Sequence, residues 1–426
     1  MEAYVMAATI SSTDVHKIQR HNVGNTDMIT DLPEGILLHI LSLLPTKDAV
    51  RTSILANKWR HLWTYLTAFH FRTGLDESRH QNPKNTANSL LDLVGRLLHK
   101  SNCVERLRVQ IFKTMIDTDK VTSLISSAAK RRVQCLELSL GHPNDNFVLP
   151  HSFSTFESLN ELRLGLKFTL HVPNGIRFPN LKKLVVSNVT FSNENSFQQL
   201  LSGCSDLQEL DLRNCYWENI MHINVAISTL RKLRIHFDLF SANYVHDMTL
   251  KIDAVNLLCL SCTCNLAIEF IPVNLTSVVI ALIDLGYDDP PNKPYAAQCA
   301  FDLLSGLSNV KSLKLYNNTL EVHNYLDGDY LNSVPCCFKS SLSCLSFLNF
   351  YGNECEIQFL TFILKNAPYL VEINIHCSRH LFADMEKLTN VKTQLENVGP
   401  ESCFIKFLPS FYEDSDNESD EDEVNN

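Results

Sequence analysis

Three cysteines in the run "CLSCTC" have the spacing most typical of a metal site. Cys259, Cys262 and Cys264 are close together, and two cysteines separated by two residues often begin a zinc-binding motif. No second pair follows at the expected distance. We therefore interpret the triplet, like the adjacent Cys336 and Cys337, as small buried or half-buried thiols, and we expect no bound metal.

Motifs for other chemistry are missing from the sequence. There is no GxxxxGK[ST] or GxGxxG loop for phosphates, no HExxH helix for zinc and no GxSxG turn for a nucleophilic serine. The sixteen histidines are scattered, so none is singled out as a catalytic base. We predict that the chain is not an enzyme, and we name no catalytic residue and no cofactor.

The end of the chain is strongly acidic. Residues 413–426 hold eight carboxylates and no basic side chain, which is too much charge for a folded segment. The whole chain carries −10, so the remainder carries only about −2, and a basic surface for nucleic acid is not expected. Ser415 and Ser419 each have an acidic residue three positions on, which suits acidophilic kinases. The alternative is a solvated tail that aids solubility.

The run "DLPEGILLHILSLLPTKDAVRTSILANKWRHLW" concentrates apolar side chains near the start of the chain. Thr30 or Asp31 can cap a helix, Pro33 fits its first turn, and apolar residues recur at helical spacing until Pro45. Thr46 can cap a second helix. So short a segment cannot bury all of these side chains in a core of its own. Part of its surface must therefore meet the rest of the chain or another protein.

This run resembles an F-box, with its LP start, its "ILSLLP" helix end and its "WRHLW" finish. The resemblance implies a three-helix domain that binds a Skp-type adaptor and, through it, a cullin–RING ubiquitin ligase. We expect Trp59, Leu62 and Trp63 to close the helices on each other instead of meeting the adaptor. The implied adaptor contacts are Leu32, Pro33, Ile36, Leu37, Ile40, Leu41, Leu44, Pro45, Val50 and Ser53.

A six-residue pattern, apolar-x-x-apolar-x-apolar, returns eleven times after this segment. Most intervals fall in the range of about 20–29 residues that leucine-rich repeats show. The last two apolar residues alternate, as in a strand that buries one face, and each unit needs a neighbour to cover it. The central apolar positions are Leu107, Leu136, Leu162, Leu184, Leu210, Leu233, Leu258, Val278, Leu313, Leu345 and Ile373.

The block "FPNLKKLVVSNVTFSNENSFQQLLSGCSDLQELDLRNC" is similar to plant F-box proteins with divergent leucine-rich repeats. It predicts a short helix from Ser196 to near Gly203. The segments "FLTFILKNAPYLVEINIHC" and "CFIKF" resemble the FBD region at the end of many of these proteins. The implied fold class is α+β, an F-box followed by an irregular leucine-rich-repeat solenoid. We predict a disordered N-terminus at 1–26, the F-box at 27–72, a linker and capping helix at 73–102, repeats at 103–335, FBD-like repeats at 336–408 and an acidic disordered tail at 409–426.

Two further features concern location and irregularity. The N-terminus makes a poor signal peptide, no apolar stretch is long enough to span a bilayer, and the fourteen cysteines suit a reducing compartment. We expect a cytoplasmic or nuclear protein without membrane contact.

The proline-rich run "DLGYDDPPNKPYAAQ" predicts an insertion loop or a break between two blocks of repeats.

These features favour a substrate-recognition subunit of an SCF-type (Skp-cullin-F-box) ubiquitin ligase. The repeats would bind a target protein whose identity the sequence does not give. One alternative is a repeat scaffold for protein interaction without a ligase role, in which the helical segment only caps the repeats. Another is a small-molecule receptor, although nothing in the sequence marks a pocket.

Overall fold

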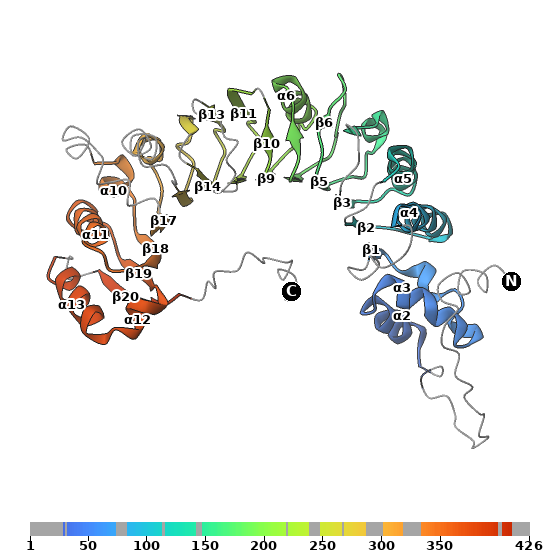
Figure 1. The fold of residues 1–426 in the computed structure, drawn as a ribbon, viewed down its shortest axis with the longest axis horizontal. Coiled ribbons are helices and arrows are strands. Elements are labelled where there is room, and N and C mark those ends of the chain that lie inside the picture. Colours follow the sequence, from blue (N-terminus) through green and yellow to red (C-terminus); the bar gives the residue numbers. More distant parts are fainter. Residues whose placement is uncertain are drawn as a thin grey trace, which may run out of the picture. The chain divides into compact units, whose positions relative to one another are not determined.

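A computed structural model describes the chain at residues 29, 32–73, 83–112, 116–141, 147–218, 220–237, 248–265, 268–286, 301–317, 334–398 and 403–410. The chain divides into two compact units, Met1–Leu207 and Gln208–Asn426. Both units mix helices with parallel strands (Figure 1). Each unit is described by itself below.

The first unit begins with a helical segment, residues 32–66. Pro33 and Pro45 each occupy the position before a helix, where a missing N–H costs nothing. The predicted capping role of Thr46 is therefore wrong: Thr46 is the first residue of its helix, and its hydroxyl accepts a 2.7 Å hydrogen bond from the His70 N–H. The segment contains α2 (Glu34–Ser42), α3 (Thr46–Arg51) and three 3₁₀ helices, Thr52–Ile54, Asn57–Trp59 and Leu62–Tyr65.

This helical segment has a small core of its own. Helix α2 packs against the 3₁₀ helix Leu62–Tyr65. Trp59, Leu62 and Trp63 are buried, as predicted from the sequence. Two large aromatic side chains supply much of the apolar area that so short a segment needs for a core.

A parallel sheet follows the helical segment in the first unit. The register aligns Leu107, Leu136, Leu162 and Leu184 with Phe69, which confirms four of the predicted repeat positions. The first strand was not predicted, because its residues lay within the expected helical domain. In spatial order the strands are β1 (Ala68–Arg72), β2 (Arg106–Ile111), β3 (Cys135–Leu140), β5 (Glu161–Leu166) and β7 (Lys183–Ser187).

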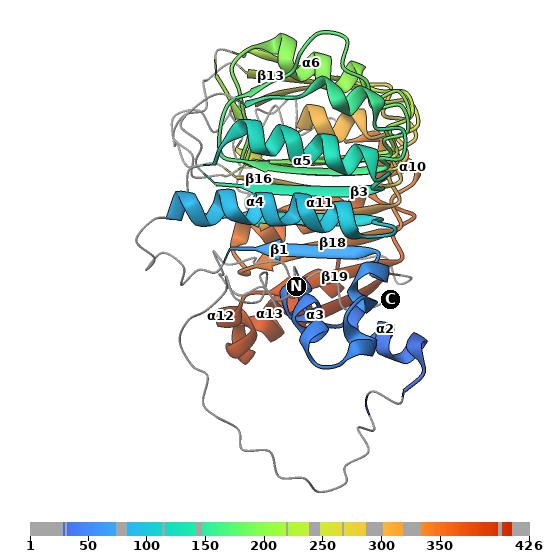
Figure 2. The ribbon, with the colours of Figure 1, turned by 90° about the vertical axis from the view of Figure 1, so that its right-hand side faces the viewer.

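Helices and short strands cover one face of this sheet (Figures 1 and 2). Asn193 caps α6 by accepting a hydrogen bond from the Ser196 N–H, so this helix begins two residues before the predicted start. It ends at Gly203, where an added Cβ would lie 2.7 Å from the carbonyl oxygen of Ile176. The covering elements are α4 (Pro83–Lys100), α5 (Thr118–Lys130), a 3₁₀ helix (His151–Thr155), α6 (Glu194–Ser202), β4 (Phe147–Val148), β6 (Leu170–His171) and β8 (Thr190–Phe191).

The second unit also contains a parallel sheet. Leu260 and Ala281 align with Leu233, so the predicted positions Leu258 and Val278 are wrong by two and three residues. Leu258 lies just before that strand and is exposed, while Leu260 and Cys262 take buried positions on the strand itself. The strands are β9 (Glu209–Arg213), β12 (Lys232–His236), β14 (Cys259–Asn265), β16 (Ile280–Gly286), β17 (Ser312–Tyr316), β18 (Cys344–Phe350), β19 (Glu372–Cys377) and β20 (Phe404–Pro409).

Other elements of the second unit accompany this sheet. Strands β11 (His222–Ala226), β13 (Met248–Asp253) and β15 (Ile268–Val273) form a separate parallel sheet, which the sequence analysis did not predict. Near the end of the chain Asn353 and Glu356 form a reciprocal capping box at the start of α11. The remaining elements are β10 (Tyr216–Trp217), α10 (Cys336–Ser340), α11 (Glu354–Asn366), α12 (Arg379–Ala383) and α13 (Met385–Glu396).

Several predictions fall outside the described residues. They are the disorder of 1–26, most of the proline-rich run, and the tail with Ser415 and Ser419. Within the described ranges, no helix is both long enough and apolar enough to cross a bilayer.

Candidate functional site

Helix α2 carries two apolar stripes on adjacent faces. Leu37 and Leu41 lie one turn apart and have no exposed surface. Ile36 and Leu43, also on one side of the helix, remain 47% and 72% exposed. The first stripe completes the core of the helical segment. The second stripe is left for a contact that this segment does not itself provide.

A second exposed apolar group follows α3. Ile54 and Leu55, at the end of the 3₁₀ helix Thr52–Ile54, are 63% and 67% exposed. Soluble proteins usually bury such side chains, and exposed groups of them mark interaction sites. Burying these two together with Ile36 and Leu43 against a partner would contribute about 5 kcal/mol before the costs of association. The helical segment therefore exposes two groups of apolar side chains, one along α2 and one after α3.

The ten contact residues predicted from the sequence have different environments. Leu37 and Leu41 are fully enclosed by their own segment, so their side chains cannot reach a partner directly, and we withdraw them as contacts. The exposed side chains of Leu43, Ile54 and Leu55 were not among the predicted contacts, although Leu43 follows Ile36 at a helical interval of seven. The other eight predicted contacts are Pro33, Ile36, Leu44 and Pro45, which are exposed, and Leu32, Ile40, Val50 and Ser53, which are half-buried.

Polar contacts hold the helical segment in place. The Lys58 ammonium donates a 2.7 Å hydrogen bond to the carbonyl oxygen of Leu32, which ties the start of α2 to the 3₁₀ helix Asn57–Trp59. The Thr46 hydroxyl joins α3 to β1, and the Asn102 N–H donates to the Thr64 carbonyl at 3.0 Å. The exposed stripe is thus presented on a fixed support, which lowers the ordering cost of binding.

Comparisons with known proteins find family matches to the helical segment, to the repeats and to a region near the end of the chain. Residues 29–70 match the F-box domain, 121–268 match "FBD-associated F-box protein At5g56370, LRR repeats", and 331–375 match FBD. The chain is 32% identical to the F-box/LRR-repeat protein At4g14096 of Arabidopsis thaliana, over 82% of this chain and 72% of that protein. It is 30% identical to the FBD-associated F-box protein At1g66310 of the same plant, over 81% and 75%. The chain belongs to the plant F-box family with leucine-rich repeats and an FBD region.

Proteins of this F-box family are generally non-catalytic adaptors, which agrees with the missing catalytic motifs. The cysteine triplet is part of the repeat core. Cys262 and Cys264 are buried on β14 with their sulfur atoms 3.6 Å apart, and Cys259 is half-buried. No group of metal-ligating side chains is present among the described residues.

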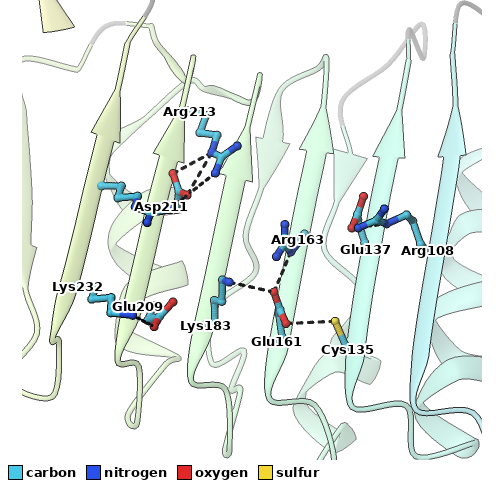
Figure 3. Close-up of polar contacts among 11 residues, drawn as sticks. Arg108, Cys135, Glu137, Glu161, Arg163, Lys183, Glu209, Asp211, Arg213 and Lys232 are labelled. Atoms are coloured by element: carbon cyan, nitrogen blue, oxygen red, sulfur yellow. Dashed lines mark hydrogen bonds and ion pairs between the residues drawn. The ribbon is translucent and has the colours of Figure 1, made fainter. Parts of the chain in front are cut away.

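The leucine-rich repeats offer a second surface, because the outward side chains of the sheet are polar. In the first unit, Arg108 and Glu137 on adjacent strands form an ion pair at 2.8 Å. Glu161 on β5 pairs with Arg163 at 2.8 Å and with Lys183 at 3.5 Å (Figure 3). These rows cross the sheet because the parallel register sets them side by side.

Burial and charge shift two ionisable groups on this face. Although burial raises the pKa of Glu161, the hydrogen bond and charge of Arg163 and the charge of Lys183 hold it below its ordinary value. The neighbouring Cys135 thiol donates to Glu161 across 3.4 Å. Burial, and then the negative charge of Glu161, raise the pKa of Cys135 to about 12. Glu161 is therefore a carboxylate and Cys135 a neutral thiol at neutral pH.

The second unit has similar ion pairs on its own sheet. Asp211 is nearly buried and accepts hydrogen bonds from Arg213 through both oxygens, while Lys232 pairs with Glu209 at 2.8 Å (Figure 3). Farther along, Lys406 on β20 pairs with Glu372 on β19 at 2.6 Å. These carboxylates are thus neutralised by neighbouring cations. Nothing in this arrangement resembles a nucleophile with its base.

Proposed function

We propose that the chain is the substrate-recognition subunit of an SCF-type ubiquitin ligase. Its F-box binds a Skp-type adaptor, and its repeats bind a target protein. The chain supplies proximity, and the other ligase subunits perform the chemistry. The observation that carries the proposal is the outer stripe of α2, which stays exposed although the core of the F-box is complete without it.

The contact is apolar and preorganised. We assign it to Ile36 and Ile40 on α2, to Pro33 and Leu43 at its two ends, and to Ile54 and Leu55. The exposed Leu44 and Pro45 and the half-buried Leu32, Val50 and Ser53 lie close to these residues in sequence and complete the proposed contact. None of the assigned residues carries a charge, so burying their side chains has a low desolvation cost and the gain scales with apolar area.

The domain boundaries that accompany this proposal are the F-box at 27–72, a linker and capping helix at 73–102, repeats at 103–335 and the FBD-like region at 336–408. The architecture that we propose is a three-helix F-box followed by an irregular leucine-rich-repeat solenoid. We place the protein in the cytoplasm or nucleus, where such ligases act, without nucleic-acid or membrane contact.

Capture of the adaptor by the full chain tests the proposal. A variant with Ile36→Asp and Leu43→Asp should lose at least about 100-fold in affinity for a purified Skp-type adaptor, because two carboxylates would be placed in an apolar contact. The matched control is Val148→Asp, which makes the same change at an exposed apolar side chain on β4. Binding should be unchanged in that control.

Two results would contradict the proposal. If the double variant still captures the adaptor, the α2 contact is wrong. If the unaltered chain captures no adaptor and no cullin complex from plant cells, the protein is a repeat scaffold without a ligase role. Leu37→Asp is unsuitable for this test, because Leu37 is buried and its replacement would unfold the F-box.

A further inference from the structure

We propose that the outward sheet face of the first unit binds an acidic, extended segment of the target protein. This inference rests on the proposed function, since it names the chemistry of the target that the repeats hold. The outward face consists of the exposed-side residues of β1, β2, β3, β5 and β7, which alternate along each strand with the buried ones.

The charge of this outward face is positive, although the chain as a whole is negative. Its outward positions, all of which the structure describes, carry two carboxylates, Glu137 and Glu161, against five cations. Just before the strands, the exposed charges of Glu105 and Lys182 cancel. The cations are Arg72, Arg106, Arg108, Arg163 and Lys183.

Both carboxylates are already engaged, and they hold the cations in place. Arg108 is fixed by Glu137, and Arg163 by Glu161, each at 2.8 Å. A planar guanidinium held by one carboxylate still has N–H groups free for a second acceptor. Arg106 is exposed and forms no ion pair with any described residue. The face therefore presents cations that are ordered before a ligand arrives, which reduces the entropy lost on binding.

The shape of the face suits a backbone lying across it. The third row of the register holds Arg72 and Gln110 on β1 and β2, and then the small uncharged residues Ser139, Gly165 and Ser187 on β3, β5 and β7. A Cβ on Gly165 would lie 3.1 and 3.2 Å from the two serine hydroxyls, so any larger side chain would crowd this row. Over β3, β5 and β7 the row therefore stays low beside the guanidinium group of Arg163, and its serine hydroxyls can donate to carboxylate oxygens.

A protein segment fits this face better than a nucleic acid does. The outward positions of the five strands include no Phe, Tyr or Trp on which a base could stack, and the ring of Phe112, just after β2, already lies against the Arg72 guanidinium. Two fixed carboxylates in the middle of the face would also repel a continuous phosphate backbone. An acidic peptide can instead space its charges to match the cations and leave neutral residues over Glu137 and Glu161.

The experiment uses the full chain with its adaptor and a fluorescent twelve-residue peptide of alternating Glu and Ser. The comparison probes are the same peptide with Gln for Glu and a single-stranded RNA of equal charge. The acidic peptide should bind, and the Gln peptide should bind at least about ten times more weakly. Equal binding of the two peptides, or tighter binding of the RNA, would overturn the proposal.

Matched variants then locate the site. Arg106→Glu should weaken peptide binding about 5-fold, while Arg177→Glu, the same change at an exposed position off the face, should alter it less than about 2-fold. Glu161→Gln should tighten binding about 3-fold, because it removes a negative charge that competes with the peptide for Arg163 and Lys183. A destabilised fold would not increase affinity, so this gain separates binding from folding.

Adaptor capture is measured on the same samples. If it persists in all three variants while Arg106→Glu and Arg177→Glu bind the peptide equally, the inference about the face fails and the proposed function stands. If the adaptor is not captured by the unaltered chain but the peptide still binds as expected, the ligase role fails and the acidic-segment site stands.

Discussion

The F-box and the neighbouring sheet of the first unit expose opposite kinds of surface. The F-box leaves Ile36, Leu43 and Leu55 uncovered, whereas the outward sheet face carries Arg108, Glu137 and other paired charges. Both surfaces are supported by a complete apolar core. The difference therefore does not come from incomplete folding, and it points to two partners of different chemistry.

The two surfaces also differ in how they gain affinity. Apolar contact is non-directional and its strength depends on the buried area. It therefore suits a partner such as the adaptor, which stays the same for every target. Charged contact depends on the position and sign of each group, so it gives selectivity and fast encounter more than raw affinity. A receptor that keeps one adaptor and selects one target needs both kinds.

The largest effect should come from placing an aspartate on the buried stripe of α2, in comparison with the same change on the exposed stripe. Leu41→Asp places a carboxylate in the F-box core and should abolish protection of residues 32–66 in hydrogen–deuterium exchange, because an unpaired buried charge costs several kcal/mol. Ile36→Asp, one face away, should leave that protection within about 2-fold of the unaltered chain. Equal loss in both variants would show that the outer stripe also belongs to the core.

The same contrast applies within one strand of the repeats. Leu164 on β5 is buried, and Leu164→Ala should destabilise this part of the sheet by about 2–4 kcal/mol, measured by exchange of the β5 amides. Arg163, its neighbour, lies on the outward face, and Arg163→Gln should cost less than about 1 kcal/mol because it removes a partly exposed ion pair. A larger cost at Arg163 would mean that the charged rows hold the sheet together and are not available to a ligand.

The repeat period predicted most of the sheet, and its failures have a physical cause. The predicted repeat positions are wrong at β14 and β16. There Cys262 and Ala281 are buried, while Leu258 and Ile280 are exposed. A pattern search that follows large apolar residues cannot tell an exposed leucine from a buried one. Only pairing with the neighbouring strand decides which residues face inward.

The docking surface was predicted less well than the fold. The apolar run predicted an F-box, but it did not separate Ile36 from Leu37, because both fit the helical period. Which stripe faces the core depends on packing against residues of a later element, such as Trp63 in the 3₁₀ helix Leu62–Tyr65. The positive sheet face was not predicted either, since its cations come from strands 22 to 38 residues apart and meet only through the register.

Ionic strength should affect binding at the charged face at least about threefold more than binding at the apolar contact. Raising NaCl from about 50 to 500 mM should weaken the acidic peptide at least about 10-fold, because salt screens exposed charges. The affinity for the adaptor should change less than about 3-fold, since the assigned contact buries apolar side chains. Both affinities can be measured by fluorescence anisotropy on one preparation. A strongly salt-dependent adaptor complex would show that charges around α2, and not its outer stripe, carry that contact.

The smallest effect should appear at Cys135, and it reports directly on the charged face. Burial and the negative charge of Glu161 raise the pKa of Cys135 to about 12, so at pH 8 almost none of the reactive thiolate is present. Alkylation by iodoacetamide, followed by mass spectrometry, should be slow at Cys135 and fast at the exposed Cys103. Glu161→Gln removes the charge and should speed alkylation of Cys135 by a factor of about 2–5, with Cys103 as the internal control. Because burial is the larger cause and remains in the variant, a much greater acceleration would mean that the strand has opened, whereas no acceleration would mean that Glu161 is not held against Cys135.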